Sequence, residues 1–555
     1  MPVTSKFPSA TSANLNLPQV DLPSVLPDDP DELKALLLAQ QRAVFALQQA
    51  FQHEVAEIQR KADERIQRLI EQIELARRRM FAASSEKSHG QAHLFDEAEV
   101  LAQDSSDEQD QAPIPAPSAI PATAPTSKPK RGKRSPLPPQ LERFDVVHDI
   151  PEAERLCACG TPMVEIGEDI SEQLDIVPMQ IRVLRNIRKR YGCPNSLHAP
   201  QTAALPPQPL PKSNASPDFL AMLLTSKYVD GLPLARFENI LQRHGMPVPR
   251  QTLARWVIGA ARLLQPLHNL IRDQLFEGGV VHMDETTVQV LKEDGKSASS
   301  TSYMWVQNGG PPGKSVVIYD YDPSRSGAVP ARLLADYRGY LMTDGYEGYN
   351  QLARAEGIEH LVCWAHARRH LVEAARVQPK GKRGKADEAI EMIGQLYGIE
   401  RRHQQANDEE RLLARQTQSR PILAMLHGWL EKTQPGVPPQ SALGKALAYL
   451  RKYWNRLIRY TERGDLPLDN NRCENSIRPF VVGRKGWLFS DTPAGADASA
   501  VIYSLVETAK ANDVEPYLWL RCIMHRLPAA KTVEDMEALL PWNLHAEDLI
   551  IPIKP

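Results

Sequence analysis

The chain of 555 residues is long enough for roughly three or four domains, and at least one of them can bury a large core. Its 66 Lys and Arg residues nearly balance its 68 Asp and Glu residues, so net charge neither supports nor excludes DNA binding. Six cysteines are too few for a disulfide scaffold and favour a reducing cytosol. No stretch of about 20 apolar residues occurs, which predicts a soluble intracellular protein without a membrane span.

A long amphipathic helix is predicted for residues 29–89, after a disordered N-terminus over residues 1–28. Asp29 is a suitable cap, Pro30 suits the first helical position, and no Gly or Pro follows within this range. Apolar residues recur at steps of three or four in one narrow stripe, which indicates leucine-zipper-like self-association; packing on the protein's own body is the alternative. The stripe consists of Val44, Leu47, Phe51, Val55, Ile58, Ala62, Ile66, Leu69, Ile73, Ala76 and Met80.

Residues 90–140 lose all periodicity and are predicted to be a disordered linker. They contain an acidic patch, a Pro/Ala run and the basic cluster "SKPKRGKRS". The cluster is either a solvated part of the linker or a contact to DNA phosphates, because clustered Lys and Arg release counterions from DNA.

A small zinc-finger-like unit is predicted for residues 141–205. Two pairs of candidate ligands, Cys157 with Cys159 and Cys193 with His198, bracket a segment that alternates as strands do. Zinc ribbons usually have two residues between the first cysteines, and here there is one. Two unrelated positions with free thiols are therefore the alternative to a structural Zn²⁺.

Residues 206–275 are predicted to be helical and to include a helix-turn-helix-like DNA-binding element. "PLARFENILQRHG" and "PRQTLARWVIGAARLL" are two helical segments with a short turn between them. The second segment begins with Arg250, Gln251 and Thr252, whose side chains suit phosphates and base edges. Any helical hairpin has a similar pattern, so a purely structural hairpin is the alternative.

The catalytic core is predicted over residues 276–493. "GGVVHMDETTVQVL", "TSYMWVQ" and "KSVVIYDY" indicate three consecutive strands, and strands and helices alternate after them. This is the element order of a ribonuclease-H-like α/β fold. In that fold a carboxylate in the middle of the first strand lies beside one at the end of the fourth, and Asp284 and Asp344 hold those positions.

The third carboxylate lies beyond a predicted helical insertion over about residues 379–466. "LDNNRCENSIRP" is predicted to begin a helix that Asp469 caps and Pro479 ends. The spacing of three and four places Asn471, Glu474 and Arg478 on one face. Residues 494–555 are predicted to form a C-terminal helical region.

Each acid also has an ordinary explanation. Asp344 precedes Gly345 and is suited to begin a turn, and Glu474 with Arg478 is suited to be an exposed helix pair. The combination favours a metal site, because an acid inside an apolar strand is costly without a cation. We expect Asp284, Asp344 and Glu474 to bind two Mg²⁺ (or Mn²⁺) ions, which would activate a water or a 3′ hydroxyl and stabilise the leaving oxygen.

Several long motifs resemble the transposases of the insertion sequence 66 family. They are "HMDETTVQVL", "LMTDGYEGYN", "CWAHARRHL" and "LDNNRCENSIRPFVVGRKGWLFSDTPAGADASAVIYSLVETAKANDVEP". The resemblance runs from "ELARRRMFAASSEK" to "LLPWN" and covers nearly the whole chain. It implies a DDE transposase with the catalytic triad Asp284, Asp344 and Glu474, a leucine-zipper-like helix and a zinc-finger-like region. The "CACG" and "CPNSLH" of this chain depart from the paired CxxC of the family.

The fold expected from these observations is multidomain α+β, with a ribonuclease-H-like core. We expect the protein to bind the terminal inverted repeats of its own element in the bacterial cytoplasm, at the nucleoid when DNA is bound, and to catalyse DNA cleavage and strand transfer. A structure-selective nuclease and a transposase-derived regulator are the alternatives. Target DNA, a second copy of the chain and accessory proteins of the same element are further expected partners.

Basic residues close in sequence to the acids are expected to contact DNA phosphates. They are Arg368, Arg369, Arg478, Arg484 and Lys485. Cys363 and His366 in "CWAH" have a ligand-like interval, but packing and helix capping are the favoured explanation for this pair.

Overall fold

The computed structural model describes residues 29–81, 180–191, 201–352, 356–377 and 383–551. Contacts divide the chain into a unit of Met1–Ala83 with Asn186–Pro555 and a second unit of Ser84–Arg185. The predicted disordered segments 1–28 and 90–140 lie outside the described residues, and so do Cys157, Cys159, Cys193 and His198. No helix in the described ranges is both long and apolar enough to cross a membrane.

Helix α1 spans Pro30–Phe81 and confirms the predicted long helix over that range; residues 82–89 are outside the described part of the chain. Most stripe residues whose side chains are described are exposed, with 45% of Leu47, 60% of Ile58 and 50% of Leu69 accessible to solvent. An apolar stripe of this kind is typical of a helix that packs against a partner. Self-association therefore remains a prediction.

The centre of the main unit is a five-stranded sheet with the order β5-β4-β3-β6-β7. β3, β4 and β5 are antiparallel to one another, whereas β6 and β7 run parallel to β3. The strands are β3 (Val280–Gln289), β4 (Thr301–Gly309), β5 (Val316–Asp322), β6 (Gly339–Thr343) and β7 (Ile358–Val362). Three antiparallel strands and then two parallel ones are the element order that the sequence predicts.

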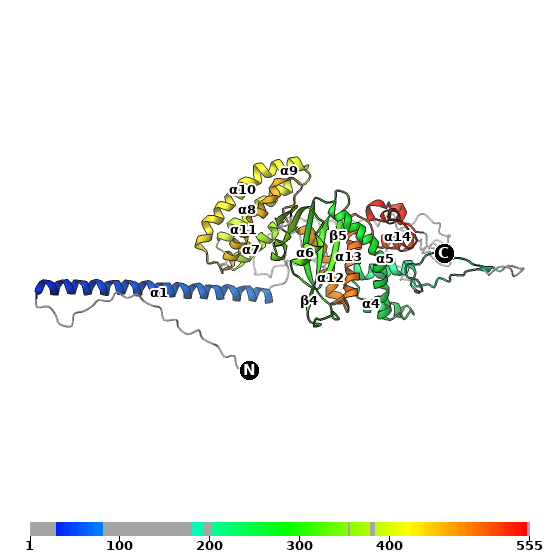
Figure 1. The fold of residues 1–555 in the computed structure, drawn as a ribbon, viewed down its shortest axis with the longest axis horizontal. Helices are drawn as coiled ribbons and strands as arrows, with labels where there is room; N and C mark the ends of the chain where they lie inside the picture. Colours follow the sequence, from blue (N-terminus) through cyan, green and yellow to red (C-terminus); the bar gives the residue numbers. More distant parts are fainter. Residues whose placement is uncertain (1–28, 82–179, 192–200, 353–355, 378–382, 552–555) are drawn as a thin grey trace, which may run out of the picture. The chain divides into compact units, whose positions relative to one another are not determined.

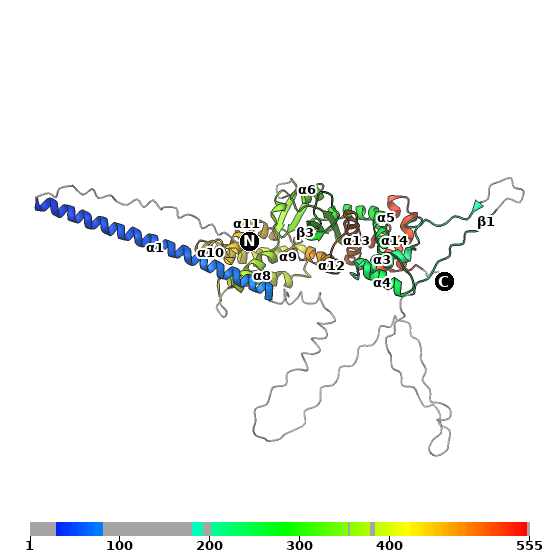
Figure 2. The same ribbon diagram turned by 90° about the horizontal axis from the view of Figure 1, so that it is seen from below.

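Helices that precede the sheet in sequence and helices that follow it lie together at the β5 end of the sheet. Figures 1 and 2 place α3, α4, α5, α13 and α14 together on that side. Their bounds are α3 (Pro217–Tyr228), α4 (Leu234–Arg243), α5 (Arg250–Phe276), α13 (Pro493–Ala511) and α14 (Pro516–Arg526), and the short α15 is Val533–Glu537. The predicted hairpin of two helices corresponds to α4 and α5, and α5 continues without a break past Pro266.

The outer edge of β5 is closed by side chains of α13. The hydroxyl of Thr508 accepts the N–H of Val317 at 3.0 Å and donates to the carbonyl of the same residue. Ser504 accepts the N–H of Tyr319 at 2.8 Å. An edge strand with satisfied backbone groups cannot pair with another chain, so α13 protects the sheet from aggregation.

The described residues of the predicted insertion form helices joined by short turns, and they lie at the β7 end of the sheet (Figures 1 and 2). Helix α7 (Trp364–Arg376) leads into it from β7. The insertion contains α8 (Lys385–Arg402), α9 (Asp408–Ala414), a π-helical turn (Arg415–Ser419), α10 (Arg420–Thr433) and α11 (Ala442–Ile458). One apolar core joins β6, β7, α7, α8, α10 and α11, and the fully buried Trp364 within it donates its indole N–H to the carbonyl of Leu457 at 2.8 Å. The insertion is thus packed directly on the strand that precedes Asp344.

Two local predictions were wrong. Helix α12 spans Asn471–Trp487 and does not end at Pro479, because the chain continues helical and turns only at Leu488, whose φ is +66°. Its N-cap is Asn470 rather than Asp469, although Asp469 does accept the N–H of Asn471 at 3.1 Å.

Between β6 and β7, where alternation of strands and helices was predicted, the described residues contain a short 3₁₀ turn over Glu347–Asn350. In the predicted zinc-finger-like unit, the described strands are β1 (Arg190–Tyr191) and β2 (Gln201–Thr202), which pair antiparallel.

Candidate active site

Asp284 lies in the middle of β3, which is paired on both sides. Strand β4 pairs antiparallel with β3 from His282 to Gln289, and β6 pairs in parallel with β3 from Val280 to His282. The strand is rich in β-branched residues, which suit a central strand. Asp284 is therefore an acid in a strand that the sheet holds rigidly, which is what a metal ligand requires.

Asp344 follows the last residue of β6 directly. One carboxylate oxygen accepts the N–H of Tyr346 at 2.7 Å, so the residue does begin a turn, as its ordinary explanation states. Gly345 has φ of +87°, a conformation that favours glycine. The turn thus fixes the carboxylate at the end of the strand. A role of Asp344 in beginning the turn is therefore compatible with a role as a metal ligand.

The insertion holds this turn in place through two tyrosines of α11. The hydroxyl of Tyr449 donates to the carbonyl of Asp344, and that of Tyr453 donates to the carbonyl of Gly345, both at 2.6 Å. A Cβ atom at position 345 would lie 3.1 Å from the Tyr449 hydroxyl, so glycine also makes room for the contact. The insertion thereby positions a candidate catalytic residue.

Glu474 lies in the first turn of α12, and Asn470 anchors the start of this helix. The buried amide of Asn470 donates to the carbonyl of Met283 at 3.2 Å, and its oxygen is 3.1 Å from Nδ1 of His282. The backbone N–H of Asn470 donates to Sγ of Cys363 at 3.1 Å. These contacts join α12 to β3 on one side and to the start of α7 on the other.

The charges of Asp344 and Glu474 act on the carboxyl of Asp284. Burial is the main cause of a strong rise in the pKa of the Asp284 carboxyl. The charges of Asp344, Glu285 and Glu474 raise this pKa further. Carboxylates that repel one another are a typical arrangement where a cation supplies the missing positive charge. The fold therefore brings Asp344 and Glu474 close enough to Asp284 for their charges to raise its pKa, and a shared metal site of the three acids stays a prediction.

Glu285, the neighbour of Asp284, has its own partners. Its carboxylate accepts a hydrogen bond from the Tyr349 hydroxyl at 2.7 Å and forms an ion pair with Arg325 at 2.6 Å. Only 3% of its side chain is exposed. Of the two adjacent acids in "MDETT", Glu285 thus has its charge balanced by Arg325, and Asp284 is the acid suited to bind a metal.

The donor set fits a divalent cation. Oε1 of Glu474 is buried and has no hydrogen bond, which is uncommon for a buried carboxylate oxygen. Asp284, Asp344 and Glu474 offer carboxylate oxygens, the ligands that Mg²⁺ and Mn²⁺ prefer. These three residues fit the metal ions expected from the sequence.

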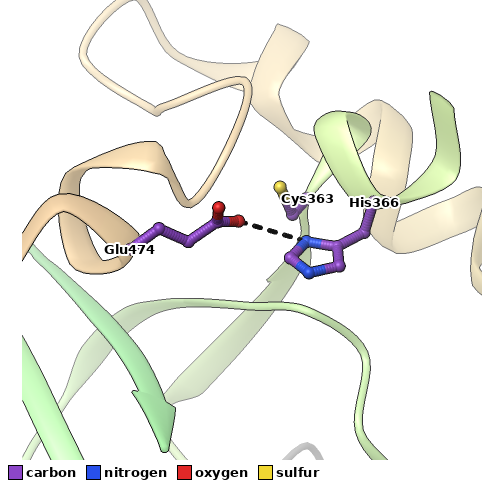
Figure 3. Close-up of side chains that lie close together, drawn as sticks. All are labelled: Cys363, His366 and Glu474. Atoms are coloured by element: carbon purple, nitrogen blue, oxygen red, sulfur yellow. Dashed lines mark ion pairs between the residues drawn. The ribbon is translucent and has the colours of Figure 1, made fainter. Parts of the chain in front are cut away.

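Glu474 has a second set of neighbours on α7. Nδ1 of His366 lies 3.6 Å from its Oε1, and a guanidinium nitrogen of Arg369 lies 3.6 Å from its Oε2. The ligand atoms of Cys363, His366 and Glu474 all lie within 4.8 Å of one another. Figure 3 shows the carboxylate and the imidazole facing each other, with the sulfur beside them.

The basic residues predicted to contact DNA near the acids lie on two helices. Arg368 is exposed on α7, next to Arg369. Arg478 and Lys485 are on α12, where Arg484 donates to the hydroxyls of Thr286 and Thr287 at 3.3 and 3.0 Å. The fold therefore brings the two helices with these residues to the strands of the triad.

Arg250, Gln251 and Thr252 form the first turn of α5. Arg250 and Gln251 are exposed, and Glu238 of α4 accepts the N–H of Arg250 at 2.9 Å. The far half of α5 packs on the sheet, where Arg272 pairs with Asp320 of β5 at 2.6 Å. With a rise of ~1.5 Å per residue, the exposed tip is roughly 33 Å from that contact.

Three positioning residues were missed from the sequence. Asn470, Tyr449 and Tyr453 hold the elements of the triad, but an amide or a hydroxyl in a helical segment carries no distinctive pattern. The pair of asparagines in "LDNNRCEN" was the available signal for Asn470, because one amide precedes the helix and is free to cap or bridge.

Family models match most of the chain. One described as the transposase IS66 family matches residues 212–498, and one described as the IS66 C-terminal element matches residues 504–542. A zinc-finger binding domain of transposase IS66 matches residues 154–195, which includes Cys157, Cys159 and Cys193 but not His198. A model described as transposase C of IS166 homeodomain matches residues 68–146.

Three uncharacterized proteins of Sinorhizobium fredii (strain NBRC 101917 / NGR234) are similar over most of their length. Protein y4jD is 32% identical over 74% of this chain and 82% of its own. Protein y4hP is 30% identical over 88% of this chain and 86% of its own. Protein y4qI is 31% identical over 93% of this chain and 97% of its own.

Proposed function

Because this chain belongs to the IS66 transposase family, with zinc-finger and helical N-terminal regions beside a mixed helical and sheet body, we propose that it is an active DDE transposase. It binds the terminal inverted repeats of its element, cleaves the DNA at the ends and transfers the 3′ hydroxyls to target DNA. The observation that carries this proposal is the position of Asp284 in the middle of β3, where the charges of Asp344 and Glu474 raise the pKa of its carboxyl.

The proposal includes a ribonuclease-H-like catalytic core. The strand order, with three antiparallel strands and two parallel ones, supports it. So do the places of the acids, one inside the first strand of the sheet, one after the fourth and one in a helix beyond the insertion. Cleavage and joining of DNA by bound metal ions need metal ligands on rigid elements. The hydrogen bonds of Asn470 and Tyr449 hold the elements that carry Glu474 and Asp344 in place.

In this mechanism Asp284, Asp344 and Glu474 would hold two Mg²⁺ or Mn²⁺ ions, which would neutralise the charge of the acids and activate a water or a 3′ hydroxyl. Asp284 and Asp344 face the reacting phosphate from the sheet. Glu474 approaches from α12, and Arg369 keeps one of its oxygens oriented. Arg368, Arg478 and Lys485 hold the flanking phosphates of the DNA.

DNA recognition is assigned to the modules that precede the core. The exposed tip of α5 carries Arg250, Gln251 and Thr252, and its distance of roughly 33 Å from the sheet is about one turn of DNA. The zinc-finger region, through Cys157, Cys159, Cys193 and His198, would add further contacts. The exposed stripe of α1 would join two copies, so that both ends of the element are held together.

A target-joining assay tests the proposal. Purified protein, pre-cut element ends and a supercoiled target are incubated with Mg²⁺, and joined products are scored on a gel. We expect strand-transfer products with Mg²⁺ or Mn²⁺, and DNA binding with little cleavage with Ca²⁺, whose coordination geometry is looser. Cleavage without any joining would instead identify a structure-selective nuclease. Binding of the ends without either reaction would identify a regulator.

A further inference from the structure

The strongest unassigned feature is the cluster of Cys363, His366 and Glu474. Zinc bonds of about 2.0–2.3 Å in a tetrahedron place ligand atoms about 3.3–3.8 Å apart. The Nδ1 atom of His366 and Oε1 of Glu474 are 3.6 Å apart, and all ligand atoms of the cluster are within 4.8 Å of one another. Sulfur, nitrogen and oxygen thus converge on one point at distances that a small shift turns into coordination.

The cluster is built from two anchored elements. Cys363 is the N-cap of α7 and His366 is three residues later, so the first turn of one helix presents both side chains on the same side (Figure 3). The backbone N–H of Asn470 donates to the Cys363 sulfur at 3.1 Å. Since Asn470 also begins the helix that carries Glu474, one hydrogen bond fixes the third ligand relative to the first two.

The two oxygens of Glu474 have different surroundings. Oε2 lies beside Arg369, whereas Oε1 faces His366 and is buried without a hydrogen bond. The separation of 3.6 Å between Oε1 and the imidazole is too long for a hydrogen bond and too short for a water molecule between the atoms. A cation that coordinates both atoms satisfies this oxygen. The imidazole then carries its proton on Nε2, which lies 3.3 Å from a guanidinium nitrogen of Arg369, so that contact has to rearrange.

We propose that Cys363, His366 and Glu474 bind a borderline-soft divalent ion, Zn²⁺ above all, and that this ion competes with Mg²⁺ for Glu474. The proposal rests on the transposase function proposed above, because it assigns a regulation to the same carboxylate. A sulfur ligand selects Zn²⁺ over Mg²⁺, whereas the two aspartates favour the hard ion. The fold therefore offers Glu474 two alternative metals, and zinc switches the enzyme off.

Zinc binding releases one proton. Burial raises the pKa of the Cys363 thiol to about 12, so the metal-free cluster holds a neutral S–H. Coordination forms the S–Zn bond and breaks the S–H bond, and the proton goes to solvent. With a thiolate and a carboxylate around a divalent ion, the cluster becomes neutral, and Glu474 no longer offers its negative charge to Mg²⁺.

Co²⁺ titration of the full chain tests the site directly, because a thiolate–Co²⁺ bond gives a near-ultraviolet charge-transfer band. We expect the wild type to bind one more thiolate-coordinated Co²⁺ per chain than Cys363→Ser does. Cys522→Ser, which changes another buried cysteine, should match the wild type. His366→Gln keeps the thiol and should weaken this Co²⁺ by about tenfold or more, which keeps the test valid if Cys363→Ser does not fold.

Activity gives the second readout: the rate of strand transfer is measured in excess Mg²⁺, first without Zn²⁺ and then with micromolar Zn²⁺. Zn²⁺ should lower this rate about tenfold or more in the wild type and in Cys522→Ser, and much less in Cys363→Ser. Equal Co²⁺ binding by the wild type and Cys363→Ser would overturn the proposal, and so would equal zinc inhibition. If Mg²⁺ supports no reaction at all, the transposase proposal fails, while the Co²⁺ titration still decides the metal site.

Discussion

Asp284 and Asp344 lie at the same level of two neighbouring parallel strands. The last pair in the register of β3 with β6 is His282 with Met342, and each aspartate is two residues beyond it. Because side chains alternate along a strand, both carboxylates belong to the same face of the sheet, on strands about 5 Å apart. Their repulsion follows from this register rather than from flexible side chains.

Replacing Asp284 by Asn should stabilise the metal-free protein at neutral pH by about 1–3 kcal/mol, since it removes a half-buried charge that its neighbours repel. Mg²⁺ should stabilise the wild type and have little effect on the variant. Thermal unfolding in buffer with EDTA or with Mg²⁺ measures both effects. Asp320→Asn is a matched control that should lose stability instead, because Asp320 is paired with Arg272.

The pH dependence of this effect has a definite sign. The folded-state pKa of Asp284 is raised, so the folded chain binds this proton more tightly than the unfolded chain. The stability that the proton contributes is complete below the ordinary value of 3.8 and is lost as pH rises through the raised pKa. The advantage of Asp284→Asn should therefore shrink as pH falls. A constant advantage between mildly acidic and mildly alkaline buffer would show that the charge of Asp284 is not its cause.

Replacing Leu47, Ile58 and Leu69 of α1 by Lys should reduce the protein to a monomer with a folded core. These side chains are about half exposed in a single copy, and a charge on the seam would have to lose its hydration there. Light scattering measures the mass, and circular dichroism checks the fold.

The control carries three lysines on the opposite face of the same helix, at Gln49, Ala56 and Gln67, all of which are exposed. It should keep the mass of the wild type. An unchanged mass for both variants would remove the partner role of α1.

Zinc in the finger region should depend on the cysteines that the family model covers. Elemental analysis of the full chain should lose about one Zn²⁺ per chain in Cys157→Ser and in Cys193→Ser. Cys522→Ser, which changes a buried free cysteine of α14, should not change the zinc content. Equal zinc in all four proteins would show that these sulfurs are not ligands.

Arg368 should contribute one phosphate contact that does not depend on DNA sequence. Neutralising it in Arg368→Ala should weaken binding of element ends and unrelated DNA alike and reduce the slope of log affinity against log salt by about 1. Arg401→Ala, on α8 of the insertion, is the control and should leave the slope unchanged. A loss confined to the element ends would assign Arg368 to base recognition.

The sequence predicted the sheet because its strands have strong period-two patterns and apolar cores, and the position of each acid within them follows directly. It did not predict that α12 passes through Pro479. A proline inside a helix removes one hydrogen bond, and packing of Cys473, Phe480 and Gly483 in the core compensates for it.

Contacts between distant segments were also beyond the sequence. Tyr449 reaches Asp344 across 105 residues, and Cys363 meets Asn470 across 107. Packing and capping were expected for Cys363 and His366, and Cys363 is indeed fully buried, although its side chain does not cap α7. The arrival of Glu474 beside them was not expected, because a local interval says nothing about a third ligand from another helix.

The central claim is that Glu474 completes a metal-dependent triad with Asp284 and Asp344. Strand transfer of pre-cut ends by Glu474→Gln, measured under conditions where gel shift shows equal DNA occupancy, tests it most directly. Glu507→Gln, which changes a buried glutamate of α13 paired with Lys510, is the isosteric control. We predict that Glu474→Gln loses several orders of magnitude in rate with Mg²⁺ while Glu507→Gln stays close to the wild type. A Glu474→Gln variant that joins ends at nearly the wild-type rate would contradict the assignment of Glu474 to the triad.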